Sequence, residues 1–257
     1  MRRHLVPVVA VLVALLMVRQ LYPYVSGSDP TVIDGYEVTR VASDLGGPTC
    51  LVWANASHLL VCDRDGGRIT ELNIETNDRR TLLDGLDRPH GLLLQDGKAI
   101  VSEAGRLTSY TVSPQGMFVE QQVLVSGVPI GNHQTNSVSA MPNGTLIWHS
   151  GSTCNVCDED DRRNAALLWV NATSGEHGVL ASGVRNSFDG AWVDGHGYFF
   201  TDNGRDWEGD HPREELNFMI EGAAYGWPDD EPETPVPEGT EAPVGTWTPH
   251  TSMNGLD

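Results

Sequence analysis

His133 lies in a short segment whose side chains could move a proton. The segment Gly131–Ser137 is almost entirely polar and leads directly into the apolar run Val138–Met141. A histidine can act as a general base near neutral pH, because its pKa normally lies close to that range. A hydrogen-bonded loop histidine without a chemical role is the simpler interpretation of any single histidine. The segment therefore supplies one candidate base, which must still be placed against a ligand.

A second chemical signal is a group of acids beside glycines in the last quarter of the chain. Its members are Asp202, Asp206, Asp210, Glu214 and Glu215. Carboxylate and backbone carbonyl oxygens are the ligands that Ca²⁺ takes, although the spacing is not that of an EF-hand loop. A solvated acidic surface would also explain the acids. The glycine turns that accompany them favour a cation site.

The overall composition is strongly acidic. The 257 residues carry 16 Lys+Arg and 35 Asp+Glu, for a formal net charge of -19, and Lys98 is the only lysine. Nucleic acids and anionic membrane surfaces are bound by clustered Lys and Arg, so neither is an expected partner. An acidic surface with almost no lysine is typical of proteins from halophiles, and an ordinary acidic secreted protein is the alternative.

The N-terminus predicts export. Fourteen residues without charge, Leu5–Val18, stand between Arg3 and Arg19. A bilayer span needs about 20 apolar residues, so a signal peptide fits this stretch better than a full span. We expect residues 1–27 to be a signal peptide or an N-terminal membrane anchor and residues 32–257 to form the exported domain. The domain would then be extracellular or held on the outer face of the cytoplasmic membrane.

Four cysteines in an exported chain predict disulfides before metal sites. Cys154 and Cys157 have CxxC spacing, but Cys50 and Cys62 do not form the second CxxC that a structural zinc site would prefer. If Thr49–Trp53 and the segment 59–63 pair as a hairpin, Cys50 and Cys62 fall directly opposite each other. A cross-strand disulfide is geometrically demanding but feasible there.

The elements that must position these residues are short strands. From Tyr36 onward, short apolar runs alternate with Gly, Asp, Asn and Pro, and no stretch shows helical periodicity. This pattern predicts an all-β domain. The first strand is expected at Tyr36–Val41, and later runs such as Leu146–His149 and Tyr198–Thr201 are spaced as in hairpins.

A repeat within this pattern indicates a β-propeller. An apolar strand, an acid, a glycine turn and an arginine recur at Asp63–Arg68, Glu103–Arg106 and Asp202–Arg205, with a degenerate copy at residues 147–151. Repeats of about 40–50 residues with several short strands each are typical of propeller blades. For Asp63 and Glu103, turn capping and surface ion pairing are the favoured roles.

Blade counting leaves the ring open. At about 45 residues per blade, four blades fit between Tyr36 and Pro228, and Pro243–Asp257 is expected to begin a fifth. An open propeller would expose an unpaired edge and an open channel. A truncated chain, or a partner chain that completes the propeller, is therefore expected.

The motifs together resemble a known family. They are Arg88–Leu92, Ser152–Glu159, Arg185–Asn186, Thr201–Asp206, Glu214–Asn217 and Tyr225–Pro228. In this order they resemble the soluble quinoprotein glucose/sorbosone dehydrogenases, especially the L-sorbosone dehydrogenase-like branch, over about residues 36–257. The resemblance implies a six-bladed β-propeller with pyrroloquinoline quinone (PQQ) and Ca²⁺ at the channel mouth. It also implies oxidation of aldoses or related sugars, with an external electron acceptor.

The resemblance implies a role for each matching residue. His133 matches the base that takes the proton of the sugar hydroxyl. Arg185 and Asn186 match the pair that contacts the quinone, where the arginine stabilises developing negative charge. The backbone carbonyls of Gly204 and Arg205 match the ligands of the calcium ion, a Lewis acid on the quinone carbonyl.

Further residues match less closely. Glu214, Glu215 and Tyr225 correspond to a second calcium-associated motif, and His90 is expected to line the sugar site. Ser152 stands where the glucose-oxidising branch has an acid, which leaves the identity of the sugar open. The basic residues that hold the quinone carboxylates in the family lie in its last two blades.

A PQQ-dependent dehydrogenase acting on an aldose or sorbosone-like sugar is the leading interpretation. The residues also fit a non-catalytic extracellular propeller that binds sugar or protein, which would show no quinone-dependent activity. A Ca²⁺-dependent lactone hydrolase is the third alternative, and it would act without quinone.

Overall fold

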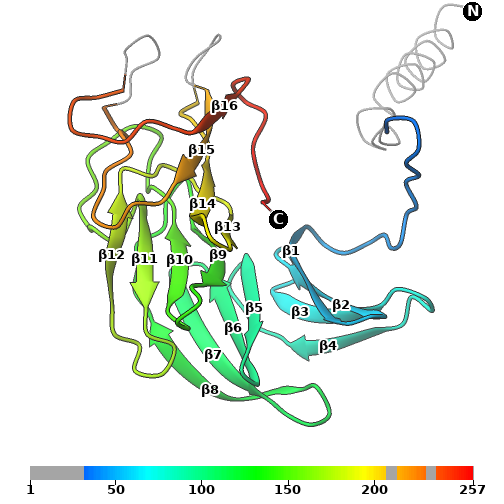
Figure 1. Ribbon diagram of the computed structural model, residues 1–257. Helices are drawn as coiled ribbons and strands as arrows, with labels where there is room; N and C mark the ends of the chain where they lie inside the picture. Colours follow the sequence, from blue (N-terminus) through cyan, green and yellow to red (C-terminus); the bar gives the residue numbers. More distant parts are fainter. Residues whose placement is uncertain (1–31, 207–212, 230–235, 257) are drawn as a thin grey trace, which may run out of the picture. The chain divides into compact units, whose positions relative to one another are not determined.

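The computed structural model describes residues 32–206, 213–229 and 236–256 (Figure 1). The chain divides into two units, residues 1–43 and 44–257. In the first unit, the described residues 32–43 form no strand, and Tyr36, Val38 and Val41 are exposed. The strand expected at Tyr36–Val41 is therefore wrong, because none of the strands in the described part of the chain pairs with this segment.

The expected leader, residues 1–27, lies outside the described residues. Across the described ranges, the structure contains no helix with the length and hydropathy needed to cross a bilayer.

The described residues of the second unit form four sheets, each of four antiparallel strands in chain order. The first sheet comprises β1 (Pro48–Asn55), β2 (His58–Asp63), β3 (Arg68–Asn73) and β4 (Arg79–Leu83). The second comprises β5 (Gly91–Gln95), β6 (Lys98–Glu103), β7 (Arg106–Val112) and β8 (Phe118–Val125). The third comprises β9 (Thr135–Ala140), β10 (Leu146–Ser150), β11 (Ala166–Val170) and β12 (His177–Ser182). The fourth comprises β13 (Gly190–Val193), β14 (Gly197–Asp202), β15 (Glu214–Phe218) and β16 (Gly245–Trp247).

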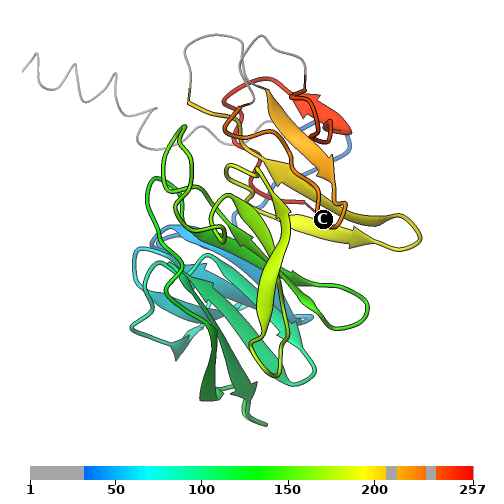
Figure 2. The same cartoon turned by 90° about the vertical axis from the view of Figure 1, so that its left-hand side faces the viewer.

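The sheets are arranged as propeller blades. The first strand of each sheet contacts the first strand of the next, since β5 contacts both β1 and β9, and β9 contacts β13. Figures 1 and 2 show the sheets following one another in chain order, with the first strands on the same inner side. The all-β, four-blade prediction is confirmed.

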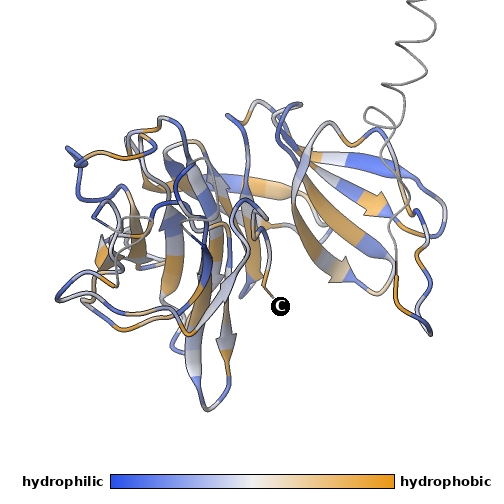
Figure 3. Ribbon diagram, turned by 90° about the horizontal axis from the view of Figure 1, so that it is seen from above, coloured by the Kyte–Doolittle hydropathy of each residue, from blue (hydrophilic) through white to orange (hydrophobic). Residues whose placement is uncertain are grey.

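The core lies between successive blades because alternate side chains of a strand point to opposite faces. In β6, Val101 packs in the cluster shared with the first blade and Ile100 in the cluster shared with the third. In β10, Trp148 packs toward the second blade and Ile147 toward the fourth. Both faces of the second and third blades are thus buried against neighbouring blades. Figure 3 shows hydrophobic residues along the strands of the sheets.

The hairpin of the first blade has the expected register. Cys50 pairs with Cys62, Trp53 pairs with Leu59, and the two cysteines form a disulfide with a Cα–Cα distance of 5.0 Å. The Asn55 Oδ1 atom accepts hydrogen bonds from the backbone N–H groups of the turn that joins the two strands.

The repeated acids hold the loops between strands. Asp63 accepts hydrogen bonds from Gly66 N–H and from Arg68, and Glu103 accepts from Asp87 N–H and from Arg106. Each carboxylate is buried at the end of the second strand of its blade. Asp63 and Glu103 therefore cap loops and form ion pairs, as predicted from the sequence.

The C-terminal segment corrects the prediction of a fifth blade beginning within Pro243–Asp257. Gly245–Trp247 pairs with β15 and is the outer strand of the fourth blade. Residues 248–256, the described residues after it, carry no strand and run back toward β14, where Met253 N–H donates to Asn203 Oδ1 at 2.8 Å (red in Figure 1). A three-residue strand is too short for its sequence to show which sheet it joins.

Candidate functional site

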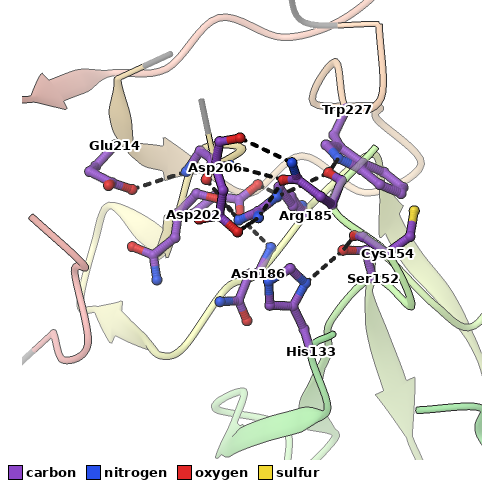
Figure 4. Close-up of polar contacts among 12 residues, drawn as sticks. His133, Ser152, Cys154, Arg185, Asn186, Asp202, Asp206, Glu214 and Trp227 are labelled. Carbon is purple, nitrogen blue, oxygen red and sulfur yellow. Dashed lines mark hydrogen bonds and ion pairs between the residues drawn. The ribbon is translucent and has the colours of Figure 1, made fainter. Parts of the chain in front are cut away.

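Arg185 is the centre of a buried polar cluster between the third and fourth blades. It lies in the loop between β12 and β13, and its side chain is 4% exposed (Figure 4). Its guanidinium donates to five oxygens, which we call the Arg185 oxygen cluster: Asn155 O, Asn155 Oδ1, Asn203 O, Gly204 O and Asp206 Oδ2. The charge is thus fixed in place by acceptors from two separate segments, the loop that carries Asn155 and the segment 203–206.

The carboxylate of Asp202 holds the backbone of the Arg185 loop. One oxygen accepts from Arg185 N–H at 2.8 Å and the other from Asn186 N–H at 2.6 Å. Burial raises the pKa of Asp202 well above its usual value, and these two bonds work against that shift. Asp202 occupies the place in the fourth blade that Asp63 and Glu103 occupy in the first two.

His133 is poised as a proton acceptor. Its Nδ1 atom lies 2.8 Å from Ser152 Oγ, and the Ser152 hydroxyl donates to Cys154 O, also at 2.8 Å. A serine hydroxyl has one proton, so Ser152 must accept from His133 Nδ1–H. Nε2 is then the unprotonated nitrogen of the ring. Burial, followed by the charge of Arg185, lowers the pKa of His133 to about 4.

The backbone after β14 presents oxygens to a cation. The carbonyl oxygens of Asn203 and Gly204 lie 3.1 and 2.7 Å from the same nitrogen, Arg185 Nη1. Glu214 Oε2 accepts from Gly204 N–H at 3.0 Å and orients this peptide. Carbonyl and carboxylate oxygens that converge on a positive group are the donor set of a hard cation, so these residues fit Ca²⁺.

Other expected site residues have their own hydrogen-bond partners. The Tyr225 hydroxyl accepts from Ile220 N–H and donates to Phe218 O. Glu215 bonds to Asn217 Nδ2 and lies near Asp202. The Arg205 side chain donates a hydrogen bond to Pro228 O.

The two residues expected at the sugar site are largely buried. Ser152 is 0% exposed, and its hydroxyl oxygen is the hydrogen-bond partner of His133 Nδ1. His90 is 6% exposed and its ring packs against Phe188, with ring centroids 5.2 Å apart. Burial lowers the pKa of His90 to about 4, so the ring is neutral at pH 7.

Three residues join the site that sequence reasoning did not single out. Asn155 contributes two oxygens to the Arg185 oxygen cluster, and Trp227 Nε1 donates to Asn155 O. Asn136 is buried and donates to Asn186 Oδ1 at 3.1 Å. The available signal was that each residue lies in a segment already noted in the sequence, Gly131–Ser137, Ser152–Glu159 or Tyr225–Pro228.

Those two cysteines form the second expected disulfide. Cys154, Cys157 and Glu159 lie close enough together to resemble a metal site. Sulfurs joined in a disulfide are not thiolates, however, and zinc binds thiolates. Glu159 instead accepts from Thr153 N–H and Oγ1.

Comparisons with known proteins agree with this architecture. The TrAA12-like family model matches residues 30–229. No curated protein matches the chain.

Several solved structures share the fold. The PQQ-bound aldose sugar dehydrogenase of Streptomyces coelicolor is 24% identical, with a TM-score of 0.70 over 82% of this chain and 71% of that one. The holo PQQ domain of pyranose dehydrogenase from Coprinopsis cinerea is 18% identical, with a TM-score of 0.72 over 86% and 70%. The calcium structure of a Trichoderma reesei family AA12 enzyme is 20% identical, with a TM-score of 0.73 over 87% and 73%.

The family model covers both polar segments that form the site, from His133 to Glu214. The fold shared with the quinone-binding propellers agrees with the resemblance in the motifs. The chain therefore belongs to the TrAA12-like family.

Proposed function

We propose that this chain is a PQQ-dependent sugar dehydrogenase that oxidises a hydroxyl of an aldose or a sorbosone-like sugar with the help of Ca²⁺. The observation that carries the proposal is a neutral histidine with a free Nε2 close to a buried, fixed arginine. Proteins with the same fold are described as a PQQ-bound aldose sugar dehydrogenase and a pyranose dehydrogenase PQQ domain.

The residues of this chain would hold the cofactors through the Arg185 loop and the backbone after β14. Arg185 and Asn186 would contact the quinone, and Asp202 fixes their backbone. The carbonyls of Gly204 and Arg205 would bind calcium, and Glu214 orients the Gly204 peptide. Glu215 would add negative charge nearby.

The chemistry needs a base and a stabilised anion. When bound, the quinone supplies the acceptor for the hydride that leaves the sugar carbon, and calcium polarises the quinone carbonyl. His133 Nε2 takes the proton of the sugar hydroxyl, while Ser152 and Cys154 O keep the proton on Nδ1. The Arg185 guanidinium offers its positive charge to the oxygen that becomes negative. An external electron acceptor would take the two electrons from the reduced cofactor.

The experiment is reconstitution of the purified chain with PQQ and CaCl₂ in high salt, which suits its acidic surface. Reduction of a redox dye is measured against a panel of aldoses and ketoaldoses. We expect dye reduction that requires quinone, and a loss of about 10²-fold or more in His133→Ala. His196→Ala is the matched control, because His196 is exposed in the β13–β14 turn.

Other outcomes would contradict the proposal. Sugar binding without quinone-dependent turnover would indicate a non-catalytic propeller, and hydrolysis of lactones without quinone would indicate a hydrolase.

Light scattering of the active species shows whether a partner chain takes part. Cell fractionation tests the export that the N-terminal residues predict, and shows whether a membrane anchor holds the domain at the outer surface.

A further inference from the structure

The loop Cys154–Cys157 packs directly against the Arg185 guanidinium. It follows the third blade's second strand and lies between the segment of His133 and the segment after β14. The disulfide closes a ring around Asn155 and Val156, of which Val156 is exposed. The ring contributes no residue to the three hydrophobic clusters between the blades.

Asn155 uses its polar groups to join three segments. Its Oδ1 accepts from Arg185 Nη2 at 2.8 Å and from Asp206 N–H at 2.9 Å, and its Nδ2 donates to Asp206 O at 3.0 Å. Its main-chain oxygen accepts from Arg185 Nε at 3.2 Å and from Trp227 Nε1 at 3.1 Å. The side chain therefore has no freedom to turn without breaking several bonds.

Asn155 sets the direction of the guanidinium plane. It binds two of the three guanidinium nitrogens, Nε and Nη2. Nη2 also donates to the carboxylate of Asp206 at 3.2 Å, but the Asp206 side chain is 79% exposed. Without Asn155, the guanidinium would keep the bonds of Nη1 to Asn203 O and Gly204 O and the bond of Nη2 to the exposed Asp206 carboxylate.

The loop that carries Asn155 is fixed from both sides. Cys154 O accepts from the Ser152 hydroxyl, which also holds His133. Glu159 accepts from Thr153 N–H at 2.6 Å and from Thr153 Oγ1 at 2.7 Å. The disulfide adds a covalent limit on the backbone of Asn155. The same loop thus contacts the support of the candidate base and the candidate anion-stabilising group.

We propose that Asn155, constrained by the Cys154–Cys157 disulfide, is a positioning residue that aims Arg185 at the quinone; this rests on the proposed function. It acts through Arg185 and touches neither sugar nor quinone. Loss of Asn155 leaves the charge in the site but releases its orientation, so both quinone affinity and turnover fall.

The test compares Asn155→Ala, Asn155→Asp and the matched control Val156→Ala, which alters the same ring without touching Arg185. Quinone binding to the calcium-loaded protein is followed by quenching of tryptophan fluorescence, and kcat and KM are measured in parallel. We expect Asn155→Ala to raise the quinone Kd at least tenfold and to lower kcat at unchanged sugar KM. Asn155→Asp keeps an acceptor for Arg185, so its quinone affinity and kcat should lie between those of Asn155→Ala and wild type. Val156→Ala should stay within twofold of wild type in both quantities.

A second readout does not depend on quinone. Phenylglyoxal modifies accessible arginines, and mass spectrometry gives the labelling rate at Arg185, a side chain that is nearly buried. We expect at least fivefold faster labelling in Asn155→Ala and in Cys154→Ser/Cys157→Ser, with Val156→Ala unchanged. Circular dichroism confirms that each variant is folded.

The outcomes separate the two proposals. Failure of wild type to bind quinone, with faster Arg185 labelling in Asn155→Ala, contradicts the proposed function and leaves the positioning of Arg185 supported. Wild-type labelling and wild-type quinone affinity in Asn155→Ala would overturn the positioning role.

Discussion

Arg185 Nη1 donates a hydrogen bond to the carbonyl oxygen of Gly204 at 2.7 Å. The same oxygen is the proposed calcium ligand, so a guanidinium and a divalent cation compete for it. Two positive groups at one carbonyl repel each other, and more strongly in a buried site than in water. Calcium binding is therefore expected to be coupled to the position of Arg185.

Removal of the guanidinium charge should strengthen metal binding. Arg185→Met keeps much of the apolar stem and leaves the Asn203, Gly204 and Asp206 oxygens without a competing charge. We expect calcium affinity without quinone to rise on the order of tenfold, or about 1.4 kcal/mol. The calcium affinity is measured by displacement of terbium, followed by its luminescence.

The control for this change is Arg64→Met, which removes the same charge at an exposed ion pair with Asp65. It should leave terbium binding unchanged. Weaker metal binding in a folded Arg185→Met protein would mean that the arginine supports the cation site instead of competing for it.

The activity of the reconstituted enzyme should persist in acid. His133 must be neutral to accept a proton, and burial together with Arg185 lowers its pKa to about 4. We expect kcat/KM to be level from neutral pH to about pH 5 and to fall as pH drops through 4. A pH–rate profile checks this, with circular dichroism at each pH to separate loss of activity from unfolding. A decline centred near pH 6.5 would contradict the environment that the structure gives His133.

Stability should begin to fall at a higher pH than activity does. Burial lowers the pKa of His90 and His133 to about 4 and of His149 to about 3, from 6.5 in the unfolded chain. Between pH 6.5 and 4 the unfolded state binds more protons, so the free energy of unfolding decreases as pH falls. The raised pKa of Asp202 acts in the opposite direction. Urea unfolding from pH 7 to 4 measures the slope, which should become shallower in His149→Gln.

The Asp202 cap should affect both stability and the site. In Asp202→Asn, one side-chain oxygen becomes an NH₂ group that cannot accept the N–H of Arg185 or Asn186. A buried unpaired N–H costs about 1–3 kcal/mol, and quinone affinity should fall because the Arg185 loop is released. Urea unfolding and fluorescence titration measure the two effects.

Glu103→Gln is the control for this substitution. Glu103 holds the Asp87 N–H in the second blade in the way that Asp202 holds the Arg185 loop. Glu103→Gln should lower the free energy of unfolding without a change in quinone affinity. Equal losses of quinone affinity in both variants would show that the effect is general destabilisation.

Local patterns predicted much of this molecule. The strand, acid, glycine and arginine repeat marks the end of the second strand in blades one, two and four, and the spacing around the first hairpin placed Cys50 opposite Cys62. Period-two alternation and short-range spacing act within a few residues, so they can be read along the chain. The grouping of Arg185 with Gly204 came from the resemblance instead.

Contacts between distant segments could not be predicted in this way. Asn155 meets Trp227 across 72 residues and Arg185 across 30, and nothing in the local sequence encodes either distance. The hydrogen bonds of the Tyr225 hydroxyl to Phe218 O and Ile220 N–H were likewise not predicted from the sequence. The outer strand Gly245–Trp247 was assigned to the wrong blade because only its partner β15 identifies it.

The two disulfides should have different consequences when removed. Cys50–Cys62 closes a loop with a sequence separation of 12 and Cys154–Cys157 one of 3. Loop-closure entropy predicts losses of about 3 and about 2 kcal/mol respectively, so Cys50→Ser/Cys62→Ser should lower the melting temperature more. Quinone affinity should show the reverse order, because only the Cys154–Cys157 ring holds Asn155 against Arg185. Calorimetry and fluorescence titration of the two double variants measure both quantities. If the first-blade variant lost more quinone affinity, stability alone would govern the site, and the short disulfide would have no part in orienting Arg185.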